Sequence, residues 1–203
     1  MSICKRALLV GALVALTAAF SAGAATAATI NPVGPIQANG ITLQVLRVSS
    51  RGFTYTCIWR LQGQILTPQI PLSPTLRAIG GITSAQITCN EPGVIVQPLV
   101  SQLSATPGPW VIDLTTVLGL PAPTGALVTL LGVRIHVLDP ANGFFCLFTG
   151  TLGILIRNGN PTAQLLGGNF VATPVAGDTC PAGLPLTKGP GQYNLVPPIV
   201  INP

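Results

Sequence analysis

Apolar and polar residues alternate along much of this chain, and the alternation predicts β-strands. It is clearest in residues 53–61, where every second residue is apolar, and it recurs in residues 146–156. A period of two puts successive side chains on opposite faces of a strand, and Gly, Pro, Asn and Asp fill the gaps between these segments. Further strands are expected at residues 41–48, 82–89, 94–100, 110–114, 127–138, 169–173 and 198–201. The pattern favours an all-β fold, an antiparallel β-sandwich of Greek-key or Ig-like type.

The phase of the alternation assigns side chains to strand faces. In residues 41–48, Ile41, Leu43 and Val45 share one face, and Thr42 and Gln44 belong to the other. Residues 68–81 contain several prolines and glycines, so we expect a loop there.

An imperfect internal duplication is centred on cysteine. An aliphatic residue and then an aromatic one follow both Cys57 and Cys146, and a Gly-Phe step precedes each of them. The next cysteine comes 32 residues later in one copy and 34 in the other. A turn rich in Ser, Asp, Asn or Gly lies before each Gly-Phe step, as in a hairpin. We therefore expect two related β units, at residues 41–89 and 127–180.

The N-terminal residues have the form of a secretory signal peptide. Lys5 and Arg6 precede an apolar run at residues 7–20, and an Ala-x-Ala cleavage pattern ends at Ala27. A membrane anchor is the alternative, but this run of 14 residues is short of the roughly 20 that span a bilayer. The sequence thus predicts a signal over residues 1–28 and export to the extracellular space or the cell surface, with the periplasm as a less favoured destination.

Removal of the signal takes Cys4 with it and leaves residues 29–203 as one expected domain, without a transmembrane segment. An even number of cysteines in an exported chain favours disulfides over metal ligation. Four cysteines allow three pairings. The duplication favours Cys57–Cys89 with Cys146–Cys180, and each closed loop should stabilise the fold by about 3–4 kcal/mol.

The mature chain carries little charge. Two of the nine Lys and Arg residues belong to the signal, so seven basic residues stand against four acidic ones, a net charge of +3. The basic residues are scattered singly, which excludes the clustered stripe expected of a nucleic-acid-binding protein. Mean hydropathy is +0.64 for the whole chain, and only 6% of its residues are charged. Such a composition favours self-association, contact with other cell-surface components, or adsorption at an apolar or hydrocarbon interface.

Few residues suit catalysis or metal binding. His136 is the single histidine, on the polar face of an apolar strand, and we expect it to face solvent. A secreted hydrolase would require a base, a nucleophile or a carboxylate pair at defined positions. The four acids are scattered, most of them in turn-like sequences: Glu91, Asp113, Asp139 and Asp178. We expect no catalytic residue, no metal site and no cofactor.

Two tryptophans and the two ends of the mature chain have alternative interpretations. Trp59 and Trp110 would either pack in the core or dip into an oil–water interface, and core packing is favoured. The end segments 29–36 and 195–201 are apolar, extended and rich in proline. They would be edge strands, or donor strands that complete the sheet of a neighbouring subunit. The donor residues would be Ile30, Val33, Ile36, Val196, Ile199 and Ile201.

The order of these features resembles the PraB-type secreted proteins, the alkane oxidation activators. The likeness covers most of the mature chain and lies in the mature start Ala28-Thr29-Ile30-Asn31-Pro32, in Cys57 with Gly63, in Gly81-Ile82-Thr83 before Cys89, in Pro109-Trp110, and in the second pair Cys146 and Cys180. The resemblance implies an exported, non-enzymatic β protein associated with the cell surface, a biofilm or hydrocarbon use. It offers no catalytic residue to carry over.

Taken together, the sequence predicts a non-enzymatic structural protein of an envelope, biofilm or apolar interface. The first alternative is an extracellular, pilus-like filament subunit that assembles by strand donation, and the second is a secreted hydrolase.

Overall fold

The computed structural model describes residues 28–70, 77–100, 110–120 and 122–203. These residues form fourteen β-strands and two short 3-10 helices, and they contain no α-helix. In this part of the chain no helix has the length and apolar character needed to cross a membrane. The predicted signal lies outside the described residues apart from Ala28, which is buried and begins the first strand.

A strand lies in every segment for which the alternation predicts one, although several bounds differ, as for the strand expected at residues 41–48, which begins at Gln44. Their bounds are β1 (Ala28–Asn31), β2 (Gly34–Gly40), β3 (Gln44–Val48), β4 (Phe53–Ile65), β5 (Gln69–Ile70), β6 (Arg77–Cys89), β7 (Ile95–Pro98), β8 (Trp110–Leu118), β9 (Gly125–Asp139), β10 (Phe144–Arg157), β11 (Thr162–Ala172), β12 (Pro185–Lys188), β13 (Gly191–Val196) and β14 (Val200–Asn202). The 3-10 helices are η1 (Ser49–Arg51) and η2 (Pro140–Asn142). The loop expected at residues 68–81 is wrong in part, because β5 and the first residues of β6 fall within it.

The main sheet is antiparallel and joins its own ends. Its strand order is β10-β9-β8-β6-β4-β2-β13-β11-β12-β3, with β7 paired to β9. Two further pairings, β10 with β11 and β3 with β4, close the sheet, so the outermost strands of this order are paired on both sides. Closure leaves neither end of this strand order as an unpaired edge that could recruit other chains.

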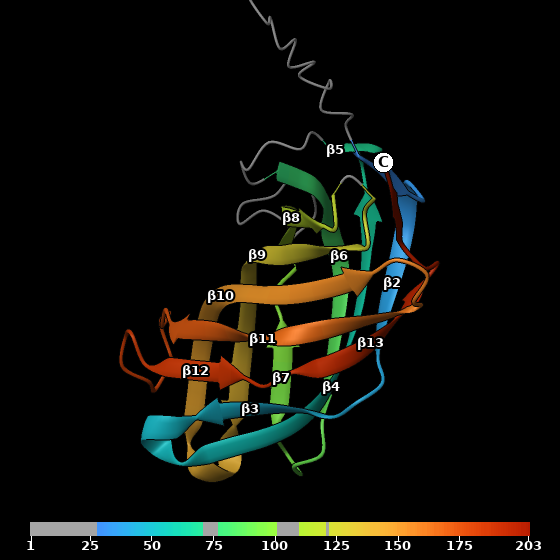
Figure 1. The fold of residues 1–203 in the computed structure, drawn as a ribbon. Coiled ribbons are helices and arrows are strands. Elements are labelled where there is room, and N and C mark those ends of the chain that lie inside the picture. The colour runs from blue at the N-terminus through green and yellow to red at the C-terminus, as the bar shows by residue number, and fades with distance from the viewer. Residues whose placement is uncertain (1–27, 71–76, 101–109, 121) are drawn as a thin grey trace, which may run out of the picture.

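Two layers of strands enclose the core. Strands β10, β11, β12 and β3 run side by side across one layer, and β2, β4 and β6 run across them in the layer behind (Figure 1). Crossed layers of this kind are a recognised form of sheet packing in which long strands bend from one layer into the other. The largest fully buried side chains lie between the layers and include Trp59, Trp110, Tyr193, Phe148 and Phe170. The predicted all-β antiparallel sandwich with two disulfides is confirmed.

The two Cys-bearing hairpins have the same turn. In β3–η1–β4 and in β9–η2–β10, a 3-10 turn ends on a left-handed glycine, Gly52 with φ 72° and Gly143 with φ 60°. A phenylalanine then starts the second strand of each hairpin, opposite Val48 in the first and Asp139 in the second. The Gly-Phe step of the duplication therefore marks one turn geometry used twice, since a left-handed residue after the turn favours glycine.

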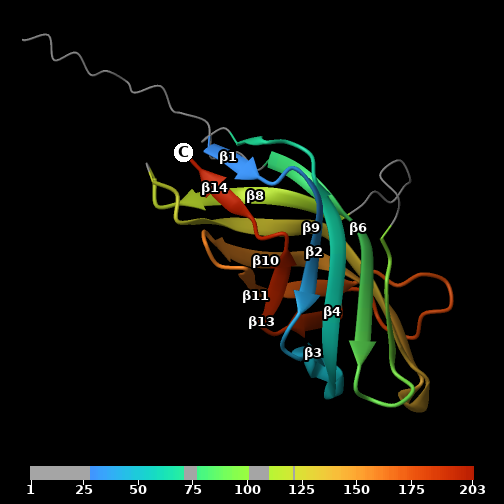
Figure 2. The same cartoon turned by 90° about the vertical axis from the view of Figure 1, so that its right-hand side faces the viewer.

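The two ends of the described chain meet in a separate small sheet. Strands β14, β1 and β5 pair in that order, and Ile30 lies opposite Ile201. Figure 2 shows β1 and β14 together at one end of the molecule, beyond the crossed layers. A cis X-Pro bond lies between each of them and the main sheet. Asn31–Pro32 follows β1, and Val196–Pro197 precedes β14. Strands β2 and β13, which follow and precede these bonds, also pair with each other.

Candidate functional site

An exposed row of aliphatic side chains leads into β3. Ile41, Leu43 and Val45 have exposed fractions of 52%, 51% and 39%, whereas Gln44 between them is fully buried. Within β3 the burial alternates, with Gln44, Leu46 and Val48 inward and Val45 outward. Ile41 and Leu43 precede the strand, and Thr42 between them is exposed as well. The predicted alternation is confirmed for Gln44 and Val45, but it is wrong for Thr42, which is exposed like Ile41 and Leu43 on either side of it. We call Ile41, Leu43 and Val45 the aliphatic row.

Gln44 is a buried polar residue with one side-chain hydrogen bond. Its Oε1 accepts a hydrogen bond from Tyr193 Oη at 3.1 Å, while its Nε2 has no partner among the described residues. In the same interior, Lys188 Nζ lies 4.9 Å from the ring centroid of Trp59 and has no hydrogen-bond partner in the described chain. Burial lowers the pKa of Lys188 to about 7, because the charged ammonium is poorly solvated there. Nothing in the sequence indicates that Lys188 is buried against Trp59.

Both tryptophans belong to the core. Trp59 and Trp110 are fully buried, and their rings pack with centroids 6.4 Å apart. Trp110 Nε1 donates to the backbone oxygen of Leu99 at 3.1 Å. The interfacial role considered for these two residues is therefore wrong, and the favoured core packing is confirmed.

All four acidic side chains of the chain are turned inward. Glu91 Oε1 accepts the backbone N–H of Thr56 at 2.7 Å, and its Oε2 is buried. Asp139 is buried and accepts hydrogen bonds from Tyr55 Oη (3.0 Å) and Asn142 Nδ2 (2.7 Å). Burial, together with this carboxylate, raises the pKa of Tyr55. Glu91, Asp139 and Asp178 accept hydrogen bonds from different groups and Asp113 has none, and no contact between two carboxylates of the kind used in glycoside hydrolysis is found among the described residues.

In the described part of the chain, the buried carboxylate of Asp113 lacks the hydrogen bonds that the other three acids accept. It is buried on β8, and its Oδ1 has no hydrogen-bond partner among the described residues. Burial raises its pKa, since desolvation disfavours the carboxylate.

Asp178 organises the loop beside the second disulfide. Its Oδ2 accepts backbone N–H bonds from Leu147 and Val175, both at 3.0 Å. Its Oδ1 lies 2.8 Å from His136 Nε2, and the carboxylate is only 2% exposed. Burial alone would raise the pKa of Asp178, but the backbone bonds and His136 outweigh it and hold the pKa below its ordinary value. His136, expected to face solvent, is instead 24% exposed and tied to this loop.

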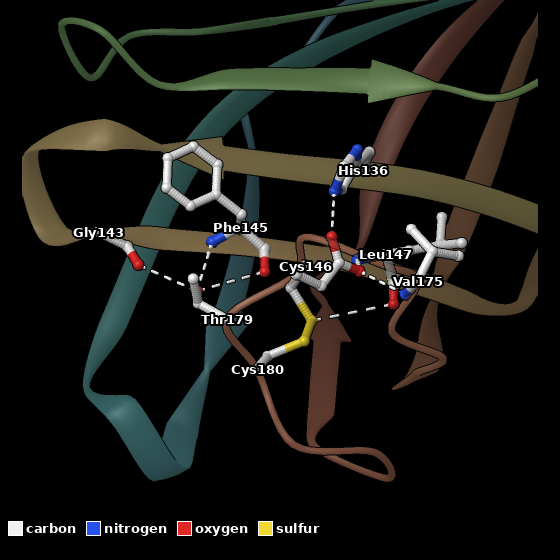
Figure 3. Close-up of a disulfide and its surroundings, with 9 residues drawn as sticks. His136, Gly143, Phe145, Cys146, Leu147, Val175, Thr179 and Cys180 are labelled. Carbon is white, nitrogen blue, oxygen red and sulfur yellow. Dashed lines mark hydrogen bonds and ion pairs between the residues drawn. A yellow bond between two sulfur atoms is a disulfide. The ribbon is translucent and has the colours of Figure 1, made fainter.

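The same loop is fixed to the hairpin turn. Figure 3 shows Thr179 beside Gly143 and Phe145, next to the bridge between Cys146 and Cys180. Thr179 Oγ1 donates to the backbone oxygen of Gly143 at 2.9 Å, and it accepts the backbone N–H of Phe145 at 2.9 Å. The His136–Asp178 pair therefore belongs to an anchor for the loop.

The first disulfide, Cys57–Cys89, joins neighbouring strands. The two residues lie opposite each other in the β4–β6 ladder. Glu91 lies close to both sulfur atoms, which gives a cluster of three potential metal ligands. The two sulfurs are bonded to each other, so they offer no thiolate, and thiolate is the form that binds metal.

The six residues proposed as strand donors divide into two groups. Ile30, Ile36, Ile199 and Ile201 are buried within their own chain, and they line an apolar cavity of about 40 Å³ together with core residues of the main sheet. Val33, which follows β1, is 45% exposed, and Val196, which precedes β14, is 47% exposed. In this structure the terminal strands complete their own fold.

Comparison of the chain with models of known families, with curated proteins and with solved structures gave no match.

Proposed function

We propose that this protein is an exported, non-enzymatic structural protein that works at an envelope, biofilm or apolar interface. The observation that carries the proposal is the aliphatic row, in which Ile41, Leu43 and Val45 are exposed at every second residue of the segment that leads into and begins β3. Scattered single apolar residues are normal on protein surfaces, whereas a contiguous set favours contact with another apolar surface.

The free energy expected from covering the aliphatic row is of the size that gives reversible adsorption. Fully burying an aliphatic side chain of this size is worth about 1.5–3 kcal/mol. Because the three side chains are about half exposed, covering the row would contribute roughly 1 kcal/mol per residue. The two disulfides support export, since such bonds persist in oxidising compartments. The resemblance to PraB-type proteins agrees with a surface role near hydrocarbons.

Partition onto alkane droplets tests this proposal. The oxidised protein is mixed with hexadecane droplets, and the bound fraction is measured after the droplets are separated. We expect the triple variant Ile41→Thr, Leu43→Thr, Val45→Thr to bind about tenfold more weakly, because threonine keeps the strand preference and removes apolar area. Ile95→Thr is the matched control, since Ile95 is 56% exposed on β7, away from the row in the chain. Equal binding by all three proteins would refute a role for the row.

A second candidate is the filament subunit that assembles by strand donation. One observation favours it: β1 and β14 form a sheet of their own, at the chain ends, with isoleucines in an apolar cavity. Such a pair is suited to exchange between copies, since identical contacts form within or between chains.

Locking the terminal strands separates this candidate from the first. Thr29 and Asn202 are cross-strand partners, so the variant Thr29→Cys, Asn202→Cys would tie β1 to β14 within one chain. If assembly uses these strands, negative-stain electron microscopy should show fibres for the wild type and none for the locked variant. A monodisperse wild-type protein would leave the adsorbing role and exclude strand donation.

A further inference from the structure

The surface charge of this protein is carried by arginine. All four side-chain carboxylates are turned inward, as described above, and Lys188 is buried. Arg47, Arg51, Arg60 and Arg157 are exposed. The net charge of +3 therefore understates the positive character of the surface, because the opposing charges are inside. Scattered arginines in the sequence gave no reason to expect a polyanionic partner, and the inward orientation of the acids, with Glu91 half-buried, changes that assessment.

One outward sheet face combines two hollows with two of these arginines, Arg47 and Arg157. The larger hollow, of about 350 Å³, is lined on β10 and β11 by Thr151, Gly153 and Asn169, and on β12 by Thr187. The smaller, of about 100 Å³, is lined by residues that include Arg157, Asn160 and Gln164. The larger volume is within the range of ligand-binding clefts.

A bulge and two glycines create the larger hollow. Gly153 pairs with Gly167, and the register then shifts so that Ile154 pairs with Leu165, which leaves Leu166 as the extra residue. Bulges commonly re-aim side chains near functional sites. Leu166 is 48% exposed and forms an apolar wall, while the glycines leave the floor open.

Beside the glycine floor runs a row of hydrogen-bonding side chains. Cross-strand pairing places Thr151 opposite Asn169, Asn169 opposite Thr187, and Thr187 opposite Arg47. All four are exposed. Neighbouring strands lie about 4.8 Å apart, so the row presents donors and acceptors at a regular spacing comparable to the length of one sugar ring. Arg47 ends this row, and Arg157 lies in the second hollow on the same strand as Thr151.

We propose that this face, the hollow over Gly153 and Gly167 with Arg47 and Arg157 on its two sides, binds an acidic polysaccharide. Threonine and asparagine side chains both donate and accept, as hydroxyl groups require. Guanidinium groups pair with the carboxylates of uronic acids, and no side-chain carboxylate of this chain is exposed to repel them. A leucine wall suits the apolar face of a sugar ring. The inference adds a ligand to the surface role proposed above and does not depend on adsorption to apolar material.

Titration calorimetry with a galacturonic acid hexasaccharide tests the proposal on the full oxidised protein. We expect binding that weakens as salt is raised, and at least about tenfold weaker binding of the neutral galactose hexasaccharide. Arg157→Gln and Arg47→Gln should each weaken binding by about tenfold, since each removes a charged hydrogen bond. Gly153→Val should also weaken it about tenfold by filling the hollow. An added Cβ at Gly153 meets only the Leu166 side chain, at 3.7 Å, so this variant should fold.

Matched controls separate this site from general charge attraction. Arg60 is exposed on β4 and lines neither hollow, so Arg60→Gln should change affinity by less than about twofold. The aliphatic-row triple variant should keep full glycan affinity, which distinguishes this proposal from the adsorbing role. Absence of binding, equal losses in Arg60→Gln and Arg157→Gln, or equal affinity for a single-stranded DNA hexamer would overturn the proposal.

Discussion

The β3–β4 and β9–β10 hairpins share a turn, but their disulfides lead to different structures. In the first, Cys57 is bonded to Cys89, its direct neighbour in the β4–β6 ladder. In the second, Cys146 on β10 is bonded to Cys180, which lies between β11 and β12 outside any strand. One bridge reinforces strands that backbone hydrogen bonds already pair, and the other holds a segment without a ladder of its own.

A carboxylate accompanies each bridge in a similar way. Glu91, two residues after Cys89, accepts the backbone N–H of Thr56, next to Cys57. Asp178, two residues before Cys180, accepts the backbone N–H of Leu147, next to Cys146. Asp178 has two additional partners, Val175 and His136. The comparison teaches that an irregular segment requires side-chain hydrogen bonds where a paired strand has its ladder.

Removing the disulfides one at a time should have the largest effect. The loops closed are of similar length, with sequence separations of 32 and 34, so each double Cys→Ala variant should lose about 3–4 kcal/mol of unfolding free energy in urea. Hydrogen exchange should differ between them. Without Cys146–Cys180, amide protection should fall around Val175 and Thr179, while without Cys57–Cys89 the β4–β6 ladder should stay protected. Equal local protection in both variants would contradict the comparison.

Replacing the two carboxylates should separate the hairpins further. Asp178→Asn places an amide donor against N–H donors in a buried position, and it should cost about 2–3 kcal/mol. Glu91→Gln affects one backbone bond at a half-buried site and should cost about 1 kcal/mol. Chemical denaturation with intact disulfides measures both values. Equal costs would mean that the ladder and the loop depend on their carboxylates alike.

The pH dependence of stability should report on Asp178. Its pKa in the folded state lies below the ordinary value, so the stabilisation it provides is complete above the unfolded pKa of about 3.9. That stabilisation is lost as the pH falls through the lower, folded pKa. The wild type should therefore lose stability in acid, and Asp178→Asn should show a shallower loss in urea titrations over the same pH range.

Asp113 should act in the opposite direction, because its carboxylate is buried without such partners. Its folded pKa is raised, so its contribution is most favourable in acid and declines as the pH rises from the ordinary value through the folded pKa. At neutral pH, Asp113→Asn should leave the protein as stable as the wild type or about 1 kcal/mol more stable. A loss of stability at neutral pH would show that Asp113 has a stabilising partner.

The shared turn predicts a modest effect that is the same in both hairpins. Gly52 and Gly143 both have positive φ, and an added Cβ at either would meet no atom within 4 Å. Gly52→Ala and Gly143→Ala should each cost about 1–2 kcal/mol from backbone strain alone. Thermal unfolding of the two variants should give closely similar shifts, and a large difference would mean that the turns are not equivalent.

The alternation in the sequence predicts the strands well because period two is a local property. It predicts the hairpins for the same reason, since turn residues and strand residues are adjacent in the chain. Both disulfides follow from the duplication, although that pattern does not reveal that Cys89 lies in a ladder and Cys180 in a loop.

The sequence does not reveal contacts between residues that are far apart in the chain. His136 and Asp178 are 42 residues apart, and neither has a local feature that indicates the other. The sequence predicts alternation through residues 41–48, but the outward direction of Val45 depends on Leu46 and Val48, whose core positions fix the phase of β3. The inward orientation of all four acids likewise depends on tertiary contacts, and with it the positive surface.

Interfacial tension at an oil–water boundary tests the central claim most directly. The oxidised mature protein is measured by the pendant-drop method beside the aliphatic-row triple variant, at concentrations where size-exclusion chromatography gives one species. The account predicts that the wild type lowers the tension and that the variant requires about tenfold more protein for the same effect. A wild-type curve that matches buffer, or that coincides with the variant, would contradict it.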